Sequence, residues 1–523
     1  MRQHSNKKAI EKPARGHWGI EVRIGRNFWA KGSSFLSAAK KTYNHDMKKI
    51  VKDTFILAFL TILVVSCAPQ KPGKRATSAS GRATASPAPV PLIPEDQVRL
   101  SNEPQKTEVF RDAGLGLFIH WGPNSQLGTE ISWPLNGASE DFVKRYYALA
   151  GTFNPVRFEA AEWARLAKLA GIEYVCFTAK HHDGFCMFDT MYSDFKITRT
   201  PYGRDIVAQV IEAFRKEGIL IGLYYSPGDV RYHFETGVPR GHIMAPAFEA
   251  TAPFGPLKRS FLDYERGQIE ELLTNYGDVF MIWFDGKCEP LKKHAWRVKQ
   301  DVFIGRGEIP TPEQEIPGQA ADRAWESCMT TSWQWSYQPN PDVRKVREVI
   351  ANLIRIRARG GNMLLNVGPR PDGRIAAPDE DLLRELGLWM MMNGEAVRGV
   401  RPWRVTNEND VWLTMRRSDG TVYAFSDLEY GLEGIKSWAG RRLTLRSVKA
   451  TPETEIAVLG QEGGVEWTED AEGLHIGITR THTLQFIKKP GSAKMRPGEK
   501  SEPYTWGPDW PVAVKMTNVL PAD

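Results

Sequence analysis

Short apolar runs alternate with amphipathic stretches along the chain, from about residue 106 to about residue 370. Apolar runs of this length, bounded by polar or glycine-rich turns, are typical of strands that are buried on both faces. The strands predicted in this way cover residues 116–119, 174–178, 219–225, 279–284 and 363–367.

The amphipathic stretches predict helices, because apolar residues recur there every three or four positions. In the first stretch Trp163, Leu166 and Ala170 fall on one face, and Gly171 ends the helix. The predicted helices cover residues 158–170, 206–216, 262–276 and 343–358. Strands and helices that alternate over this length predict a parallel sheet covered on both faces. We therefore expect an α/β protein with a (β/α)8-like, TIM-type catalytic barrel at 106–402, and a doubly wound sheet as the alternative.

The pattern changes after about residue 402 to short β-type runs separated by polar turns. These runs predict a small C-terminal antiparallel β-sandwich over residues 403–488. Residues 489–523 are rich in proline and lysine, and we expect them to form a loosely attached tail. The runs lie at residues 411–415, 422–425, 455–459, 474–478 and 484–486.

A targeting segment precedes the barrel. A basic region begins at Met47, and an apolar run follows at residues 55–65 that is too short to span a bilayer comfortably. Cys67 stands just after this run, so residues 47–67 resemble a bacterial lipoprotein signal peptide in which this cysteine is lipidated. An ordinary signal peptide with an incidental cysteine is the alternative. We expect an exported bacterial lipoprotein, periplasmic or anchored to the outer membrane.

The regions around this segment have no folding pattern. Residues 1–46 lie upstream of the expected start and are interpreted as an untranslated extension. Residues 68–105 begin with a stretch dominated by Pro, Ala, Ser, Thr and Gly, which predicts a disordered tether between anchor and barrel.

The formal charge of +7 comes from the leader. Residues 1–66 hold 13 Lys and Arg against 4 Asp and Glu, a net of +9, which leaves 56 against 58, or −2, for the rest. We therefore infer no nucleic-acid partner. Besides Cys67 the chain has four cysteines without a CxxC pair or zinc spacing, so a disulfide stays possible but unassigned. They are Cys176, Cys186, Cys288 and Cys328.

Polar and aromatic residues follow the predicted strands, where a barrel carries its chemistry. The histidine pair His181 and His182 cannot point inward together from a regular strand, because adjacent side chains face opposite sides. A metal site needs several converging ligands, and these two histidines converge only if they lie in the loop beyond the strand, so a metal site is disfavoured. A structural role for either histidine stays open. Asp285 ends an apolar strand, where a carboxylate is costly unless it is solvated, hydrogen-bonded or functional. The strand-end groups are 120–122, 180–183, 224–226, 283–286, 325–326 and 366–368.

Sugar binding and glycoside hydrolysis both account for these strand-end groups. Imidazole, ammonium and indole groups at strand ends can hold sugar hydroxyls and cover a sugar ring. Asp285 with a second carboxyl group across the cleft would then form a glycosidase pair; as a structural alternative it caps the following turn.

The motifs, in their order, resemble those of glycoside hydrolase family 29, the α-L-fucosidases. The resemblance extends from about residue 106 to 404, and KHHDGF followed by WFDG is its most specific part. The motifs are LFIHWG at 117–122, KHHDGF at 180–185, YYSP at 224–227, WFDG at 283–286, WESCMT at 325–330, NMLLNVGP at 362–369 and MNGEA at 392–396.

The resemblance implies a retaining, exo-acting hydrolase of terminal α-L-fucosyl linkages that needs no cofactor or metal. Asp285 matches the nucleophile, and Glu326 matches the acid/base in the tryptophan–glutamate motif. The loop that carries the acid/base varies in this family, so Glu313 is the second candidate, with Glu308 and Glu315 nearby. Lys180 and Asp183 are interpreted as orienting their loop. The residues that match substrate-binding positions are His120, His181, His182, Tyr224, Trp283 and, more weakly, Trp133.

This chain departs from the family pattern after the first strand, where Glu130 and Trp133 are separated instead of adjacent. The expected partner is a fucosylated oligosaccharide or glycoconjugate, and contact with a membrane is expected only through the lipid anchor. The competing functions are a lipid-anchored carbohydrate-binding protein on a degenerate barrel and a metal-dependent hydrolase.

Overall fold

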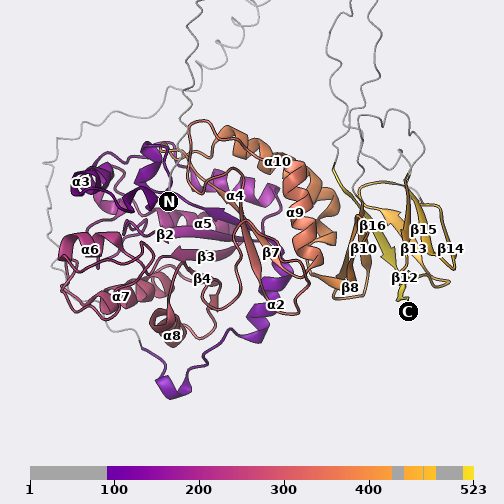
Figure 1. The fold of residues 1–523 in the computed structure, drawn as a ribbon, viewed down its shortest axis with the longest axis horizontal. Helices are drawn as coiled ribbons and strands as arrows, with labels where there is room; N and C mark the ends of the chain where they lie inside the picture. Colours follow the sequence, from indigo (N-terminus) through magenta and orange to yellow (C-terminus); the bar gives the residue numbers. More distant parts are fainter. Residues whose placement is uncertain (1–90, 427–440, 463, 479–509, 523) are drawn as a thin grey trace, which may run out of the picture. The chain divides into compact units, whose positions relative to one another are not determined.

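Seven parallel strands form the central sheet in a computed structural model of the chain (Figure 1). Their order is β5-β4-β3-β2-β1-β7-β6. The structure describes residues 91–426, 441–462, 464–478 and 510–522. The strands are β1 Leu115–Ile119, β2 Tyr174–Lys180, β3 Leu220–Tyr225, β4 Met281–Phe284, β5 Phe303–Ile304, β6 Glu326–Thr330 and β7 Asn362–Val367.

The five predicted strands correspond to β1, β2, β3, β4 and β7, which confirms the barrel-like class. Every residue of β1, β2, β4 and β7 is buried, as expected for a sheet covered on both faces. The strands β5 and β6 carry weaker signals, since β5 has two residues and β6 begins Glu-Ser-Cys.

An irregular segment, residues 305–314, follows β5 and takes the place of an eighth strand. At its start the N–H of Gly305 donates to Ile282 of β4 (2.9 Å). Toward its end the N–H of Cys328, in β6, donates to Pro312 (3.1 Å), and the N–H of Gln314 donates to Cys328 (2.9 Å). This one segment therefore hydrogen-bonds to β4 at its beginning and to β6 at its end.

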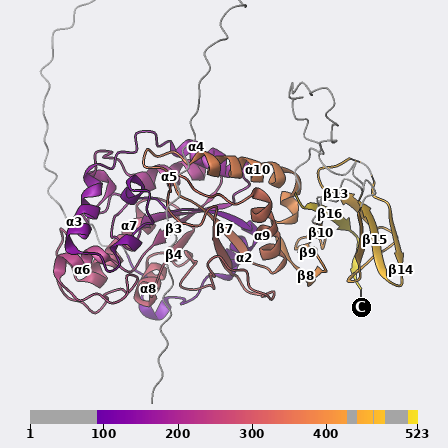
Figure 2. The same ribbon diagram turned by 45° about the horizontal axis from the view of Figure 1, so that its top comes forward.

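Helices surround the sheet (Figures 1 and 2). The helix α4 buries Trp163, Leu166 and their neighbours, as the amphipathic pattern predicts, and Asp205 caps α5 by accepting from the N–H of Ala208 (2.8 Å). The α-helices are α2 Pro104–Ala113, α3 Glu140–Ala148, α4 Ala160–Leu169, α5 Ile206–Lys216, α6 Val230–Thr236, α7 Phe261–Thr274, α8 Glu289–Val298, α9 Val346–Ala358 and α10 Ala377–Asn393. The 3-10 helices are η1 Glu95–Gln97, η2 Pro123–Gln126, η3 Trp133–Leu135, η4 Leu149–Gly151, η5 Ile197–Arg199 and η6 Gly394–Ala396.

The chain joins the barrel earlier than the predicted boundary at residue 106. The N–H of Ile93 donates to Arg297 (2.9 Å), and the side chain of Asn102 donates to Ile304 (2.8 Å). The last part of the predicted tether, residues 91–103, therefore lies against α8 and β5.

The C-terminal region contains two antiparallel sheets, in the orders β13-β16-β10-β9-β8 and β11-β15-β14, and the short pair β12-β17. Leu413 and Val514 of the larger sheet share an apolar cluster with Leu443 and Ile476 of the smaller one. In the larger sheet, β8 and β9 pack against α9 (Figures 1 and 2). The strands are β8 Val400–Glu408, β9 Val411–Arg416, β10 Val422–Ser426, β11 Arg441–Leu445, β12 Val448–Lys449, β13 Glu455–Val458, β14 Trp467–Asp470, β15 Gly473–Ile478, β16 Val512–Thr517 and β17 Leu520–Pro521.

The prediction of a loose tail at 489–523 is wrong for its end. Residues 512–517 form β16, which pairs with β10 on one side and β13 on the other. Val514 and Met516 are buried in the apolar cluster, and this alternation outweighs the polar composition of the preceding residues.

The predicted signal peptide, Cys67, most of the tether and the run at 484–486 lie outside the described residues. Within the described part of the chain, no helix has the length and apolarity needed to cross a bilayer. The four cysteines in this part are buried and unbonded to one another.

Candidate active site

Polar side chains converge at the carboxyl ends of the strands. His120 follows β1, His181 and His182 follow β2, and Asp285 follows β4. All three histidines are buried, and Tyr224, near the end of β3, lies among them. The structure thus brings together the residues that the sequence predicts for substrate binding, apart from Trp133.

Three donors surround the carboxylate of Asp285. The hydroxyl of Tyr224 donates to Oδ2 (2.7 Å), and Nη1 of Arg306 donates to Oδ1 (2.7 Å). Nε2 of His182 lies 3.3 Å from Oδ2. Burial alone would raise the pKa of Asp285, but the hydrogen bond and charge of His182 and the charge of Arg306 hold that pKa below its usual range. The carboxylate is therefore ionised at neutral pH.

Each histidine is fixed through its Nδ1 atom. Nδ1 of His120 lies 2.6 Å from Oδ1 of Asn366, and Nδ1 of His181 lies 2.7 Å from Oγ of Ser132. His182 makes the same kind of contact with Ser226. The Nε2 atoms remain for a ligand, or, in His182, for Asp285. The sequence did not assign these supporting roles, because the partners are distant along the chain: Asn366 lies in β7, Ser132 directly before η3 and Ser226 just after β3.

Burial keeps two of the histidines neutral. It lowers the pKa of His120 to about 4, although the hydrogen bond to Asn366 acts in the opposite direction. Burial, with the neighbouring His182 and His120, also lowers the pKa of His181 well below its usual value. At neutral pH these rings can donate or accept hydrogen bonds without carrying a charge.

Aromatic rings line the same space. Tyr224 stacks on His181 with ring centroids 5.1 Å apart, and on Trp283 with centroids 5.4 Å apart. The sequence did not single out Trp335, whose ring lies 5.2 Å from that of His120. The Trp-Gln-Trp run at 333–335 was the available signal. These surfaces suit a ligand with both apolar faces and hydroxyl groups.

The two adjacent histidines do converge. The strand β2 ends at Lys180, so His181 and His182 lie in the turn beyond it and escape the alternation of a strand. Ligating atoms of both histidines and of Asp285 lie within 4.8 Å of one another, a possible metal-binding arrangement. Arg306 already places a positive charge on the same carboxylate, which disfavours a bound cation.

The sequence predicted Glu326 at the carboxyl end of a strand. In the structure it is instead the first residue of β6. The sequence misplaced it because this strand begins with polar residues. The side chain is 0% exposed, and its carboxylate accepts hydrogen bonds from Tyr174 and from Nε1 of Trp283 (2.9 Å). Burial raises the pKa of Glu326 to about 7, partly offset by these hydrogen bonds.

Strand register separates Glu326 from Asp285. Tyr174, which contacts Glu326, is the first residue of β2. The N–H of Asp285 instead donates to Tyr225, which lies in register with Lys180 at the end of β2. The six steps from residue 174 to residue 180 correspond to about 20 Å of strand at about 3.3 Å per residue. The two carboxylates are therefore attached near opposite ends of the sheet.

Glu313 lies at the same end as Asp285. It belongs to the irregular segment beside β6, its side chain is 45% exposed, and its carboxylate forms an ion pair with Nη2 of Arg306. Nη1 of the same guanidinium donates to Asp285. One arginine thus bridges the two carboxylates.

Four other predicted residues have supporting or peripheral places. Lys180 is fully buried and forms ion pairs with Glu265 and Asp229. Asp183 accepts from the N–H of Phe185 (3.1 Å) within its own turn. Both sets of contacts are consistent with residues that orient the loop. Glu130 accepts from two backbone N–H groups of the loop that carries Trp335. Trp133 lies apart, 41% exposed, with its ring 6.1 Å from that of His242.

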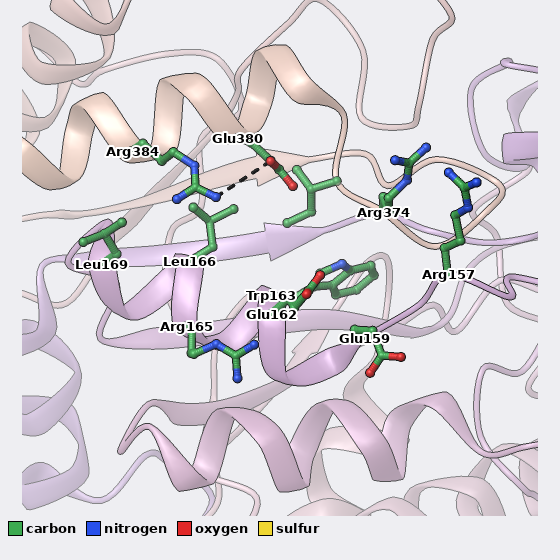
Figure 3. A pocket seen from close by; sticks show the side chains of 11 residues that line it. Arg157, Glu159, Glu162, Trp163, Arg165, Leu166, Leu169, Arg374, Glu380 and Arg384 are labelled. Atoms are coloured by element: carbon green, nitrogen blue, oxygen red, sulfur yellow. Dashed lines mark ion pairs between the residues drawn. The ribbon is translucent and has the colours of Figure 1, made fainter. Parts of the chain in front are cut away.

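A separate hollow of about 380 Å³ lies between α4 and α10 (Figure 3). Trp163 and Leu166 form its apolar side, and Glu380 pairs with Arg384 at its edge. Its lining includes none of the histidines and carboxylates described above, so it is not part of the strand-end site.

Comparisons with known proteins place this site in context. The family model described as Alpha-L-fucosidase matches residues 95–395. Tissue alpha-L-fucosidase of Mus musculus is 30% identical over 407 residues, which cover 71% of this chain and 87% of that protein. The corresponding protein of Rattus norvegicus is 29% identical over 415 residues, covering 71% of this chain and 85% of the relative.

Solved structures share the fold. Alpha-L-fucosidase isoenzyme 1 from Paenibacillus thiaminolyticus has a TM-score of 0.63 and 27% identity, over 80% of this chain and 99% of that one. A family 29 alpha-L-fucosidase from Bacteroides thetaiotaomicron, solved as a trapped covalent intermediate, has a TM-score of 0.59 and 23% identity, over 82% of this chain and 100% of that one.

Proposed function

Because the chain belongs to the alpha-L-fucosidase family and is a glycoside hydrolase, we propose that it removes terminal α-L-fucosyl groups with retention of configuration. The reaction proceeds through a covalent fucosyl-enzyme. The similar Bacteroides protein, trapped as a covalent intermediate, is consistent with this route. A carbohydrate-binding protein without catalytic activity is not favoured, because the expected carboxylates are present.

Asp285 is the proposed nucleophile, and its environment is the main support. The carboxylate is held ionised by His182, Arg306 and Tyr224 at the point where the histidines converge. It attacks the anomeric carbon, and the bond from that carbon to the leaving oxygen breaks as the ester forms.

Glu313 is the proposed acid/base in place of Glu326. A retaining enzyme needs its two carboxyl groups about 5–5.5 Å apart. Arg306 bridges Glu313 to Asp285, whereas Glu326 is attached near the opposite end of the strands. The partial exposure of Glu313 also allows it to protonate the leaving oxygen and then to deprotonate an incoming water.

The histidines hold the fucose. Neutral His120 and His181 direct their free Nε2 atoms toward hydroxyl groups, and Trp283 and Trp335 cover the apolar side of the ring. Because these groups are buried at the end of the barrel, we expect the site to take a terminal sugar residue, in keeping with exo action.

The experiment is to incubate the protein with an α-L-fucosyl disaccharide and follow the first-formed anomer of fucose by NMR. α-L-Fucose should appear first, and Asp285→Asn should lower the rate by at least about 10³-fold. Initial release of β-L-fucose would contradict retention. An unchanged rate in Asp285→Asn would contradict the nucleophile.

We also propose that the enzyme is exported and lipid-anchored through Cys67, on the strength of the signal pattern alone. Replacing Cys67 with alanine should move fucosidase activity from the membrane fraction to the soluble fraction. Retention of the variant in the membrane fraction would contradict the anchor.

A further inference from the structure

Trp333 exposes 74% of its surface, in the loop that follows β6. Two residues later in this loop, Trp335 faces His120 in the strand-end site. The indole of Trp333 therefore presents an apolar surface to solvent in the same loop that contributes Trp335 to the site.

A chain of contacts connects Trp333 to the proposed acid/base. The guanidinium of Arg344 lies over the indole, 4.9 Å from the ring centre. Nη2 of Arg344 donates to Oε1 of Gln314 (3.4 Å), and Gln314 directly follows Glu313. Trp333 is therefore on the side of the site where Glu313 lies.

We propose that Trp333 is a stacking platform for the sugar ring to which the fucose is attached, so that the substrate class is a fucosylated saccharide. The inference rests on the proposed function, since the acid/base must lie next to the oxygen of the leaving group. A pyranose ring has an apolar C–H face that packs on indole.

Arg344 prepares the platform by covering one face of the ring. Its Nε atom donates to the carbonyl of Thr330 (3.0 Å), which fixes the guanidinium to the end of β6. With one face of Trp333 covered and most of its surface exposed, the other face is available to a sugar.

Trp333→Ala tests this role with two substrates. An α-L-fucosyl disaccharide has a sugar leaving group, whereas α-L-fucosyl fluoride has none. For the disaccharide, kcat/KM should fall about 3- to 10-fold, the loss expected for one aromatic contact. For the fluoride it should stay unchanged, and Trp333→Phe should restore most of the disaccharide activity.

Met391→Ala is the matched control, because Met391 is also 74% exposed but lies on α10. It should leave both substrates unaffected. Equal losses on both substrates in Trp333→Ala would indicate damage to the fucose site and overturn the proposal, as would an unchanged disaccharide rate. Hydrolysis of the fluoride by the unmodified protein separates either failure from failure of the proposed function.

Discussion

Exchanging each candidate acid/base for glutamine distinguishes the two carboxylates. Glu313→Gln removes an acidic group beside the proposed nucleophile, whereas Glu326→Gln changes a fully buried hydrogen-bond acceptor. We expect the first to lower activity and the second to lower stability.

The contacts set the size of each effect. General acid/base catalysis contributes about 10²–10⁴-fold, so kcat on a fucosyl disaccharide should fall by that factor in Glu313→Gln. Stability should change by less than about 1 kcal/mol, because the ion pair with Arg306 is partly exposed. In Glu326→Gln the amide oxygen can accept from Nε1 of Trp283, and the amide NH2 group then faces Tyr174, whose hydroxyl must accept instead of donate. Two hydrogen bonds to a carboxylate are thus replaced by weaker bonds to a neutral amide, which costs about 1 kcal/mol of unfolding free energy.

The assay combines kinetics with thermal unfolding. Glu313→Gln should retain more activity on α-L-fucosyl fluoride than on the disaccharide, since fluoride needs less protonation, and azide should partly restore turnover. Glu326→Gln should keep kcat within about tenfold and unfold at a lower temperature. The reverse pattern, with azide rescue in Glu326→Gln and normal disaccharide hydrolysis in Glu313→Gln, would refute the assignment.

Three further outcomes follow. Arg306→Ala removes a positive charge that holds the pKa of Asp285 below its usual range, so the acidic limb of the kcat/KM profile should move to higher pH; an unmoved limb would contradict this. Lys180→Met leaves Glu265 and Asp229 buried without their cation and should cost about 3–5 kcal/mol in urea unfolding, whereas a loss below about 1 kcal/mol would show that the pair is dispensable. The raised pKa of Glu326 means that the folded state binds more protons than the unfolded state between pH 4.5 and about 7, so its contribution to stability falls as pH rises; Glu326→Gln should flatten that part of the melting-temperature profile.

Sequence pattern predicted the strands that form long, mainly apolar runs, and it missed the buried strands β5 and β6, which are short or begin with polar residues. Strands β1, β2, β3, β4 and β7 are strongly apolar, so their positions and the barrel-like class could be read directly. The strand β6 was missed because it begins with a glutamate and a serine, and the sequence alone could not tell at which end of a strand Glu326 lies. The strand β16 was obscured by the proline- and lysine-rich residues before it.

The candidate site was predictable in part. His120, Asp285 and Tyr224 follow from strand ends and motifs, but the convergence of His181 with His182 depends on where β2 stops, which the pattern does not fix. The bridging role of Arg306 had no sequence signal, because it depends on how an irregular segment folds across the sheet.

That segment, residues 305–314, has a consequence for how the enzyme can diversify. Asp285 follows a strand held by neighbours on both sides, so its position changes little when loops change. Glu313 instead sits on a stretch held by a few backbone bonds, where insertions and deletions are tolerated more easily than within a ladder. If the proposed roles hold, the proposed nucleophile can stay fixed while changes in loop length move the proposed acid/base, which would adapt the leaving group without rebuilding the barrel.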